Sequence, residues 1–139
     1  MSGVRFEVRE RQEITMSIRS YRDLVVWQKA MDLVVASYAL TKRLPHTELY
    51  GLVSQIQRAA VSIPANIAEG HGREHLGDYL HHLSMANGSL MELETHLLVA
   101  VRLNYLNNEE LDEMSGQTQE AGRMLAGLIR SLKKSRPDP

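Results

Sequence analysis

The chain has 139 residues, a formal net charge of −1 and no cysteine. This length suits one domain with one core, and the lack of cysteine excludes disulfides, thiolate zinc sites and cysteine nucleophiles. A protein that wraps nucleic acid usually carries a basic excess, which this chain lacks in total, although a local basic patch is compatible with a neutral sum. No apolar run approaches the ~20 residues of a membrane span, and the N-terminus shows no signal peptide. We therefore expect a soluble, cytoplasmic protein.

The first 17 residues differ in composition from the rest of the chain. They are charged, and only the alternation V-R-F-E-V suggests a strand. Because charged termini are usually loose, we expect residues 1–17 to form a disordered tail, or to reflect a start codon chosen in error upstream of Met16. We expect residues 1–15 to be dispensable for assembly and stability. The alternative is a functional arm. Residues 18–134 are predicted to form one bundle, and residues 135–139 a C-terminal tail.

The first predicted helix runs from about Asp23, a suitable N-cap, to Leu44, and Pro45 ends it. Its apolar residues recur at helical spacing in two neighbouring stripes. One stripe comprises Leu24, Trp27, Met31, Val34 and Tyr38, and the other comprises Val26, Ala30, Leu33 and Leu40. An isolated bundle needs only one buried stripe on each helix. The second stripe predicts a further contact, most simply with copies of the same chain.

Three more helices are predicted, at about residues 47–69, 73–106 and 108–134. The third helix also has two apolar stripes. They comprise Leu76, Tyr79, Leu83, Ala86, Leu90, Leu93 and Leu97, and beside these Met91, Leu98, Val101 and Tyr105. Short connections between long helices imply antiparallel neighbours. The predicted fold class is therefore all-α, an antiparallel up-down-up-down four-helix bundle.

Glycine and asparagine mark the helix ends. Gly70 and Gly72 close the second predicted helix, and Asn108 is the predicted N-cap of the fourth. Three further glycines lie inside the fourth helix, where we expect them to permit close contact between helices. They are Gly116, Gly122 and Gly127.

Residues 59–70, AAVSIPANIAEG, place a proline inside the second predicted helix. Pro64 offers no N–H to the Ala60 carbonyl and bends a helix axis. One interpretation is a binding pocket at this bend. We favour the other, in which Pro64 fixes the bend while Asn66 and Glu69 tie it to neighbouring helices, because buried polar groups are normally paired.

Antiparallel packing about the predicted turns sets which residues lie at the same height on neighbouring helices. Glu69 falls level with Arg73 and close to Arg22, so these two arginines are its expected partners. Arg58 falls near Asp32, and we expect these two side chains to form a partly buried ion pair. The residues predicted to hold the architecture together are Trp27, Asp32, Arg58, Pro64, Asn66 and Glu69.

The histidines and serines show no catalytic or metal-binding pattern. A ferritin-like metal site needs two Glu-x-x-His motifs, and the nearest match is the single pair Asp78 and His81. His71 and His75 are one turn apart but flanked by glycines, which favours a solvated cluster over a metal site. No serine has the His and Asp partners of a triad, and no glycine-rich phosphate loop is present. We expect no catalytic, cofactor-binding or metal-binding residue.

Three segments, YRDLVVWQKAMDL, ELYGLVSQIQRAAVSIPANIAEG and GSLMELETHLLVAVRLNYL, closely resemble a known family. It comprises the bacterial four-helix-bundle proteins encoded within intervening sequences of 23S ribosomal RNA genes. The resemblance covers about residues 20–134 and implies a bundle assembled into a homopentamer, with no known catalytic activity. The chain is distantly similar to the accessory variability determinant of diversity-generating retroelements, a basic pentamer that works with a reverse transcriptase and RNA. This chain differs from that relative in charge, so the nucleic-acid role does not simply carry over.

Two classes of function remain open. The first is a non-enzymatic homo-oligomeric bundle with a scaffolding or partner-binding role, and the second is an RNA- or DNA-binding accessory protein, such as a partner of a reverse transcriptase. The position of the basic residues separates them, because a shared basic rim favours nucleic acid and dispersed charges favour the scaffold. The residues concerned are Lys42, Arg43, Arg102, Arg123, Arg130, Lys133, Lys134 and Arg136. The neutral total favours a scaffold with no membrane partner.

Overall fold

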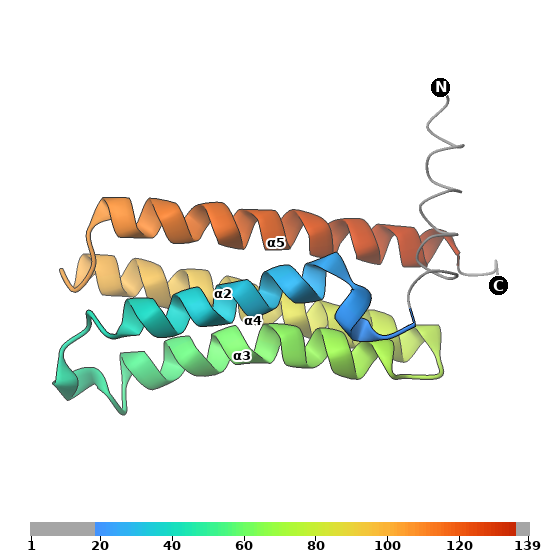
Figure 1. Ribbon diagram of the computed structural model, residues 1–139, viewed down its shortest axis with the longest axis horizontal. Helices are drawn as coiled ribbons and strands as arrows, with labels where there is room; N and C mark the ends of the chain where they lie inside the picture. The colour runs from blue at the N-terminus through green and yellow to red at the C-terminus, as the bar shows by residue number, and fades with distance from the viewer. Residues whose placement is uncertain (1–18, 136–139) are drawn as a thin grey trace, which may run out of the picture.

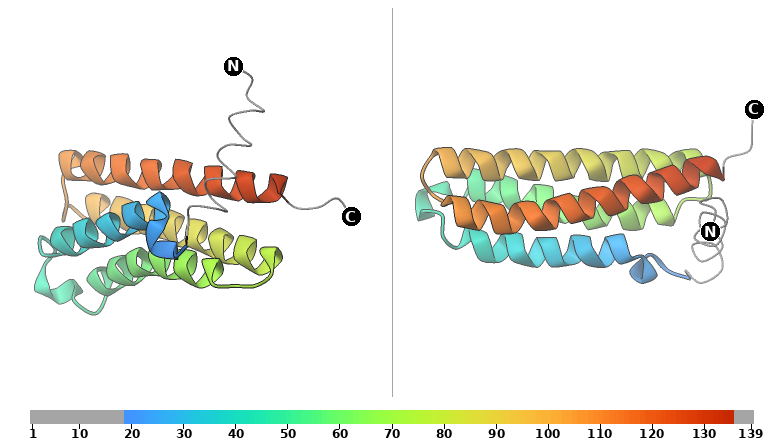
Figure 2. Two further views of the ribbon diagram at one scale, coloured as in Figure 1. Left: turned by 45° about the vertical axis from the view of Figure 1, so that its right-hand side comes forward. Right: turned by 90° about the horizontal axis from the view of Figure 1, so that it is seen from above.

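The computed structural model describes residues 19–135. Within this range every regular element is a helix, and long helices run in alternating directions along the molecule (Figures 1 and 2). The α-helices are α2 (Val25–Thr41), α3 (Leu52–His71), α4 (Leu76–Arg102) and α5 (Asn108–Lys134), and short 3-10 helices η1 (Tyr21–Asp23) and η2 (His46–Glu48) precede α2 and α3. The predicted all-α four-helix bundle is confirmed. The tail predicted for residues 1–17 lies outside the described residues.

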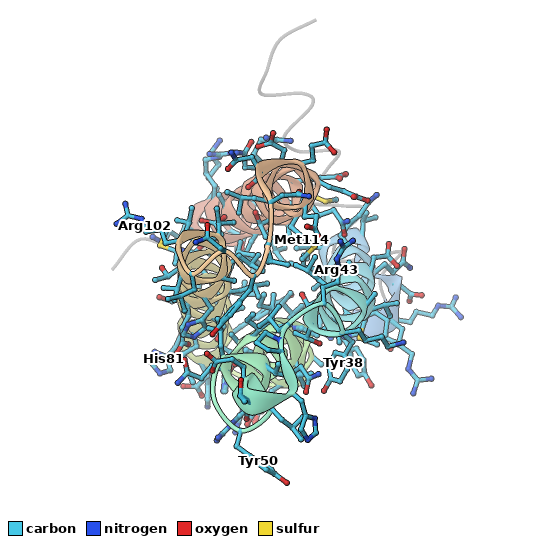
Figure 3. All side chains as sticks on the ribbon, turned by 90° about the vertical axis from the view of Figure 1, so that its left-hand side faces the viewer. Tyr38, Arg43, Tyr50, His81, Arg102 and Met114 are labelled. Atoms are coloured by element: carbon cyan, nitrogen blue, oxygen red, sulfur yellow. The ribbon has the colours of Figure 1, made fainter. Side chains whose placement is uncertain are left out.

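The four helices enclose one apolar core. α3 packs between α2 and α4, while α5 closes the bundle against α4 and α2, so α2 and α4 lie on a diagonal (Figure 3). The largest fully buried apolar side chains are those of Leu33, Ile56, Ile63, Ile67, Leu83, Leu93, Leu97 and Leu125. On α2 one predicted stripe enters the core through Val26, Ala30 and Leu33, whereas Met31 and Tyr38 of the other stripe are exposed. Within residues 19–135 no helix is both long and apolar enough to span a membrane.

The chain enters α2 through a capping box rather than through the predicted N-cap. The hydroxyl of Ser20 accepts from the backbone N–H of Arg22, and the Asp23 carboxylate accepts from the N–H groups of Arg19 and Ser20 at 3.1 and 3.2 Å. Asp23 is therefore the third residue of η1, and the prediction that it caps α2 was wrong. The helix also ends at Thr41 instead of Leu44, because the chain tightens there into bonds of the 3-10 type.

The predicted second helix begins later than expected. Residues His46–Glu48 form η2, and α3 starts only at Leu52, whose backbone N–H donates to the Glu48 carboxylate at 3.2 Å. The same carboxylate accepts from the Tyr105 hydroxyl at 3.1 Å, which links the α2–α3 connection to the α4–α5 connection. This hydrogen bond is the main reason that the pKa of Tyr105 is raised above its usual value. α3 then continues two residues past the predicted end, to His71.

The other helix ends also shift. α4 spans Leu76–Arg102, shorter at both ends than the predicted 73–106. The N-cap of α5 is Asn107 rather than Asn108. Its side chain accepts from the N–H of Glu110 at 2.8 Å, and the Glu110 carboxylate accepts from the Asn107 N–H at 3.1 Å. This capping box satisfies two donors that the first turn would otherwise leave unpaired.

Glycine allows close approach of helices at two places. A Cβ atom on Gly70 would lie 2.7 Å from the Cβ of His82, so α3 and α4 approach closely there. A Cβ on Gly122 would lie 3.3 Å from a methyl group of Leu90 on α4, so this glycine permits a close contact between helices, as predicted. The prediction fails for Gly116, which has open space around it, and for Gly127, which faces only Arg130 of its own helix.

Candidate functional site and interaction surfaces

A chain of polar side chains fills the seam between α3 and α4. The hydroxyls of Ser62 and Ser89 are hydrogen-bonded at 2.8 Å. The Asn66 amide donates to the backbone oxygen of Ser62 at 2.9 Å and to its hydroxyl at 3.0 Å. Its carbonyl oxygen lies 3.3 Å from Nδ1 of His82 on α4. Asn66 is buried, and it does bridge to a neighbouring helix as predicted.

Glu69 extends this polar seam towards the α3–α4 turn. Its carboxylate forms an ion pair with Arg73 at 2.9 Å and lies 4.0 Å from Nδ1 of His82. The predicted partner Arg73 is confirmed, but Arg22 instead lies over the ring of Tyr21, 5.8 Å from its centroid. The Glu69–Arg73 pair is half-exposed, so it stabilises the turn only slightly.

The predicted ion pair between Asp32 and Arg58 does not form. Both side chains are exposed, and within residues 19–135 no salt bridge joins them. Arg58 lines a groove of about 530 Å³ between α3 and α4, together with Glu92 and His96 of α4. The predicted position of Arg58 along α3 was compatible with a contact to Asp32 of α2. The Arg58 side chain, however, points towards α4, and α2 packs on the other side of α3.

Pro64 and Trp27 occupy structural positions. α3 continues through Pro64 without a break, and the Pro64 side chain is buried. The bend that we predict at Pro64 stays a prediction. Trp27 is half-buried against the core and meets Tyr21 edge-on, with ring centroids 5.3 Å apart.

The part of the chain that the structure describes holds no group of three or more side chains able to bind a metal ion. His71 instead packs edge-on against Tyr79, with ring centroids 5.8 Å apart. The Tyr79 hydroxyl is buried without a hydrogen-bond partner, and burial raises the pKa of Tyr79 to about 12. His96 lies 3.8 Å from Glu92 across one turn of α4. The contacts of His71 and Tyr79 are therefore packing contacts where α3 ends and α4 begins, and Glu92 and His96 form a pair on the surface of α4.

An apolar patch lies on the outside of α2 and α3. It comprises Met31, Val35, Tyr38 and Val61, with exposed fractions of 39, 69, 43 and 42%. The α2 members follow each other at spacings of four and three, which puts them on one helix face. Tyr38 lies at the edge of α2 towards α3, where it lines a groove with Gln57 (Figure 3). Gln57 donates to Thr41 at 3.1 Å, and Val61, one turn further along α3, therefore lies near the height of Tyr38. We call these four residues the α2–α3 patch.

A second apolar patch lies on the opposite flank. Met91 and Leu98, two turns apart on α4, are 60 and 51% exposed. Leu98 borders a cavity of about 150 Å³ between α4 and α5, which is also lined by Leu111 and Thr118. We call Met91, Leu98 and this cavity the α4–α5 patch. Because α2–α3 and α4–α5 are opposite sides of the bundle, the two patches face away from each other.

The basic residues of the described chain do not gather on one rim. Lys42, Arg43 and Arg102 lie at the end where α2 and α4 finish, and Arg43 is held by Glu110 at 2.9 Å (Figure 3). Arg123, Arg130 and Lys133 lie along α5 towards the other end. Arg136 is outside the described residues. Within one subunit the charges are dispersed, which is the arrangement that favours the scaffold.

Sequence reasoning missed His82 as a member of the seam. Nothing in the dipeptide His81–His82 shows which ring turns inward, since that depends on the helix phase. The sequence signal that could have identified His82 was its position in the helix. His82 is adjacent to the core residue Leu83 and is half-buried, whereas His81 is exposed.

The fold and its surfaces define this protein as an antiparallel four-helix bundle with a polar seam and two apolar patches. The family model of the 23S rRNA-intervening sequence proteins matches residues 22–127, and the chain belongs to this family. The resemblance seen in the sequence is therefore confirmed. The fold is similar to the crystal structure of a protein of unknown function from the S23 ribosomal protein family of Bacteroides thetaiotaomicron. The two are 26% identical with a TM-score of 0.71, and the match covers 76% of this chain and 96% of that chain. A search of curated proteins found no match.

Proposed function

We propose that this protein is a self-assembling bundle that acts as a scaffold or binding partner and performs no catalysis. The observation that carries the proposal is the pair of apolar patches on opposite flanks. Single exposed apolar residues are normal on a protein surface. These residues instead follow one another at helical spacing, and the α2–α3 patch crosses to a second helix, which is typical of an interaction surface.

The two patches differ in shape, which supports contact between unlike surfaces. The α2–α3 patch carries the Tyr38 ring at the border of an open groove of about 390 Å³, whereas the α4–α5 patch contains a smaller and more enclosed cavity of about 150 Å³. Joining one patch of each copy to the other patch of the next is a head-to-tail contact, and such contacts close into a ring when the rotation permits. We propose a homopentameric ring, as the family resemblance implies.

A nucleic-acid-binding accessory role is the second candidate. The uncovered basic residues Arg123, Arg130 and Lys133 on α5 support it. The dispersed charges at the two ends of the subunit and the net charge of −1 support the scaffold instead.

Light scattering of the purified chain tests the scaffold proposal. We expect several copies in each particle at micromolar concentration, and Val35→Glu or Leu98→Glu should reduce the mass. Met85→Glu is the matched control, because Met85 is 44% exposed and lies outside both patches. A monomeric wild-type chain would contradict the proposal, and so would patch variants that behave like the control. Absorbance at 260 nm in the purified particle would favour the nucleic-acid alternative.

A further inference from the structure

The outer face of α5 has a charge pattern that is complementary to itself. Its exposed residues recur at alternating spacings of three and four along the whole helix. This row of exposed residues comprises Glu109, Asp112, Gly116, Gln119, Arg123, Ala126, Arg130 and Lys133, and the exposed residues Asn108, Glu113 and Lys134 lie beside it. The two acidic residues lie at one end of this face, and the three basic residues lie beyond its centre. The face is therefore acidic at the start of α5 and basic towards its end.

We propose that this face binds the same face of a second copy, with the two α5 helices antiparallel about a twofold axis near residue 121. In that register Asp112 meets Arg130 of the second copy, and Glu109 meets Lys133. A twofold contact repeats each pair, so four ion pairs form. The proposal goes beyond the apolar patches, since it concerns ion pairs on the outer face of α5, of which Gln119 also lines the cavity of the α4–α5 patch.

Small residues allow the two helices to approach. The same register places Gly116 opposite Ala126 of the second copy, and no other group lies within 4 Å of the position of a Gly116 Cβ. Helices with small residues at the contact pack at the short end of the usual 8–10 Å range. Residues that recur at alternating spacings of three and four also form the contact line between two long helices in coiled coils.

Four charged residues of this face have no partner among residues 19–135. Along the described chain, Glu109, Asp112, Arg130 and Lys133 form no hydrogen bond or ion pair, although Glu110 and Glu120 of the same helix do. The helix dipole favours acids in the first turn and bases in the last, and its effect fades beyond those turns. Asp112 and Arg130 lie outside the terminal turns of Asn108–Lys134, so the dipole does not explain them.

The test uses the full chain carrying Val35→Glu and Leu98→Glu, so that the patches no longer contribute. Sedimentation at low salt should show a dimer that dissociates in about 0.5 M salt, because screening weakens exposed ion pairs. Adding Asp112→Arg or Arg130→Asp should each weaken the dimer about tenfold or more, since like charges then meet. The two changes together should restore it. Glu92→Arg, a charge reversal on α4, is the control and should have no effect.

Three results would overturn the proposal. The first is a monomer at low salt, and the second is a double reversal that weakens the dimer further instead of restoring it. The third is an unchanged mass in Arg130→Asp together with loss of binding to a fluorescent DNA duplex, which would assign the basic half to phosphate. Because the patches are disabled throughout, failure here leaves the proposed scaffold function intact, and failure of the patches leaves this dimer intact.

Discussion

The carbonyl oxygen of Asn66 on α3 faces Nδ1 of His82 on α4 at 3.3 Å. Both hydrogen bonds donated by the Asn66 amide go to Ser62, so the oxygen is left to accept and His82 carries its proton on Nδ1. A buried asparagine thus joins two helices beside the close contact between Gly70 and His82. The polar groups beside Pro64 are part of the architecture.

Replacing Asn66 by alanine should therefore destabilise the protein. The change removes the amide bonds to Ser62 and leaves Nδ1 of His82 without the Asn66 oxygen, while the Ser62 hydroxyl keeps Ser89. Such a loss costs about 1–3 kcal/mol in free energy of unfolding. Asn87→Ala on α4 is the matched control, because along the described chain Asn87 forms no hydrogen bond. Urea unfolding followed by circular dichroism measures both variants. Equal stability of the two variants would show that the bridge contributes nothing.

Gly70 should not tolerate a methyl group. A Cβ there would lie 2.7 Å from the Cβ of His82 and 3.2 Å from the backbone oxygen of Tyr79. Gly70→Ala must push α3 and α4 apart, at a cost of about 1–3 kcal/mol. Gly88→Ala, on α4 with no atom within 4 Å, should instead stabilise by about 0.5–1 kcal/mol, because alanine favours a helix. Thermal unfolding of both variants measures the change in stability. If Gly70→Ala and Gly88→Ala both stabilised or both destabilised the protein, the account of these two glycines would be wrong.

Pro64→Ala tests whether the proline sets the shape of α3. In an isolated helix the change should stabilise by about 3 kcal/mol. Here a straighter α3 would move Ile67 and Glu69 out of register, so we expect most of that gain to be cancelled and assembly to suffer more than helix content. Circular dichroism and sizing should be compared for the same samples. A strongly stabilised variant with unchanged assembly would rule out this role for Pro64.

The buried Tyr79 should make the protein sensitive to alkali. Its pKa in the folded state is raised to about 12 by burial, while an unfolded tyrosine ionises near 10. The unfolded state therefore releases this proton first, and stability should be intact below pH 10 and fall between pH 10 and 12. Tyr79→Phe should reduce this fall and, since the hydroxyl lacks a partner, should leave stability at neutral pH equal or higher. Stability that is lost equally by the variant and the wild type over this range would contradict this account.

Helical spacing predicted the four α-helices because it depends only on which residues are apolar. Two kinds of detail were not predicted correctly, namely the helix starts and the directions of some side chains. Helix starts were misplaced although the sequence carried the signal. Ser20 with Asp23, and Asn107 with Glu110, each fit the spacing of a capping box. Side-chain direction was harder to predict. Counting residues gives the height of Arg58 along α3, but the neighbour that its side chain faces depends on how the helices pack.

The polar seam was partly predictable from the sequence, whereas the apolar patches were not. Asn66 was predictable, since a polar residue within an apolar run needs a partner. The α2–α3 patch was visible only as a surplus stripe, because the sequence does not say which of two neighbouring stripes faces the core. That choice is made by the positions of α3 and α5 around α2.

The most direct test of assembly through unlike patches is sedimentation of two variants, alone and mixed, in about 0.5 M salt, which screens the α5 charges. Val35→Glu disables the α2–α3 patch, and Leu98→Glu disables the α4–α5 patch. If each patch binds the other, either variant alone is monomeric, and the mixture forms heterodimers joined by the one intact pair of patches. Homodimers of either variant alone, or a mixture that stays monomeric, would contradict the head-to-tail contact.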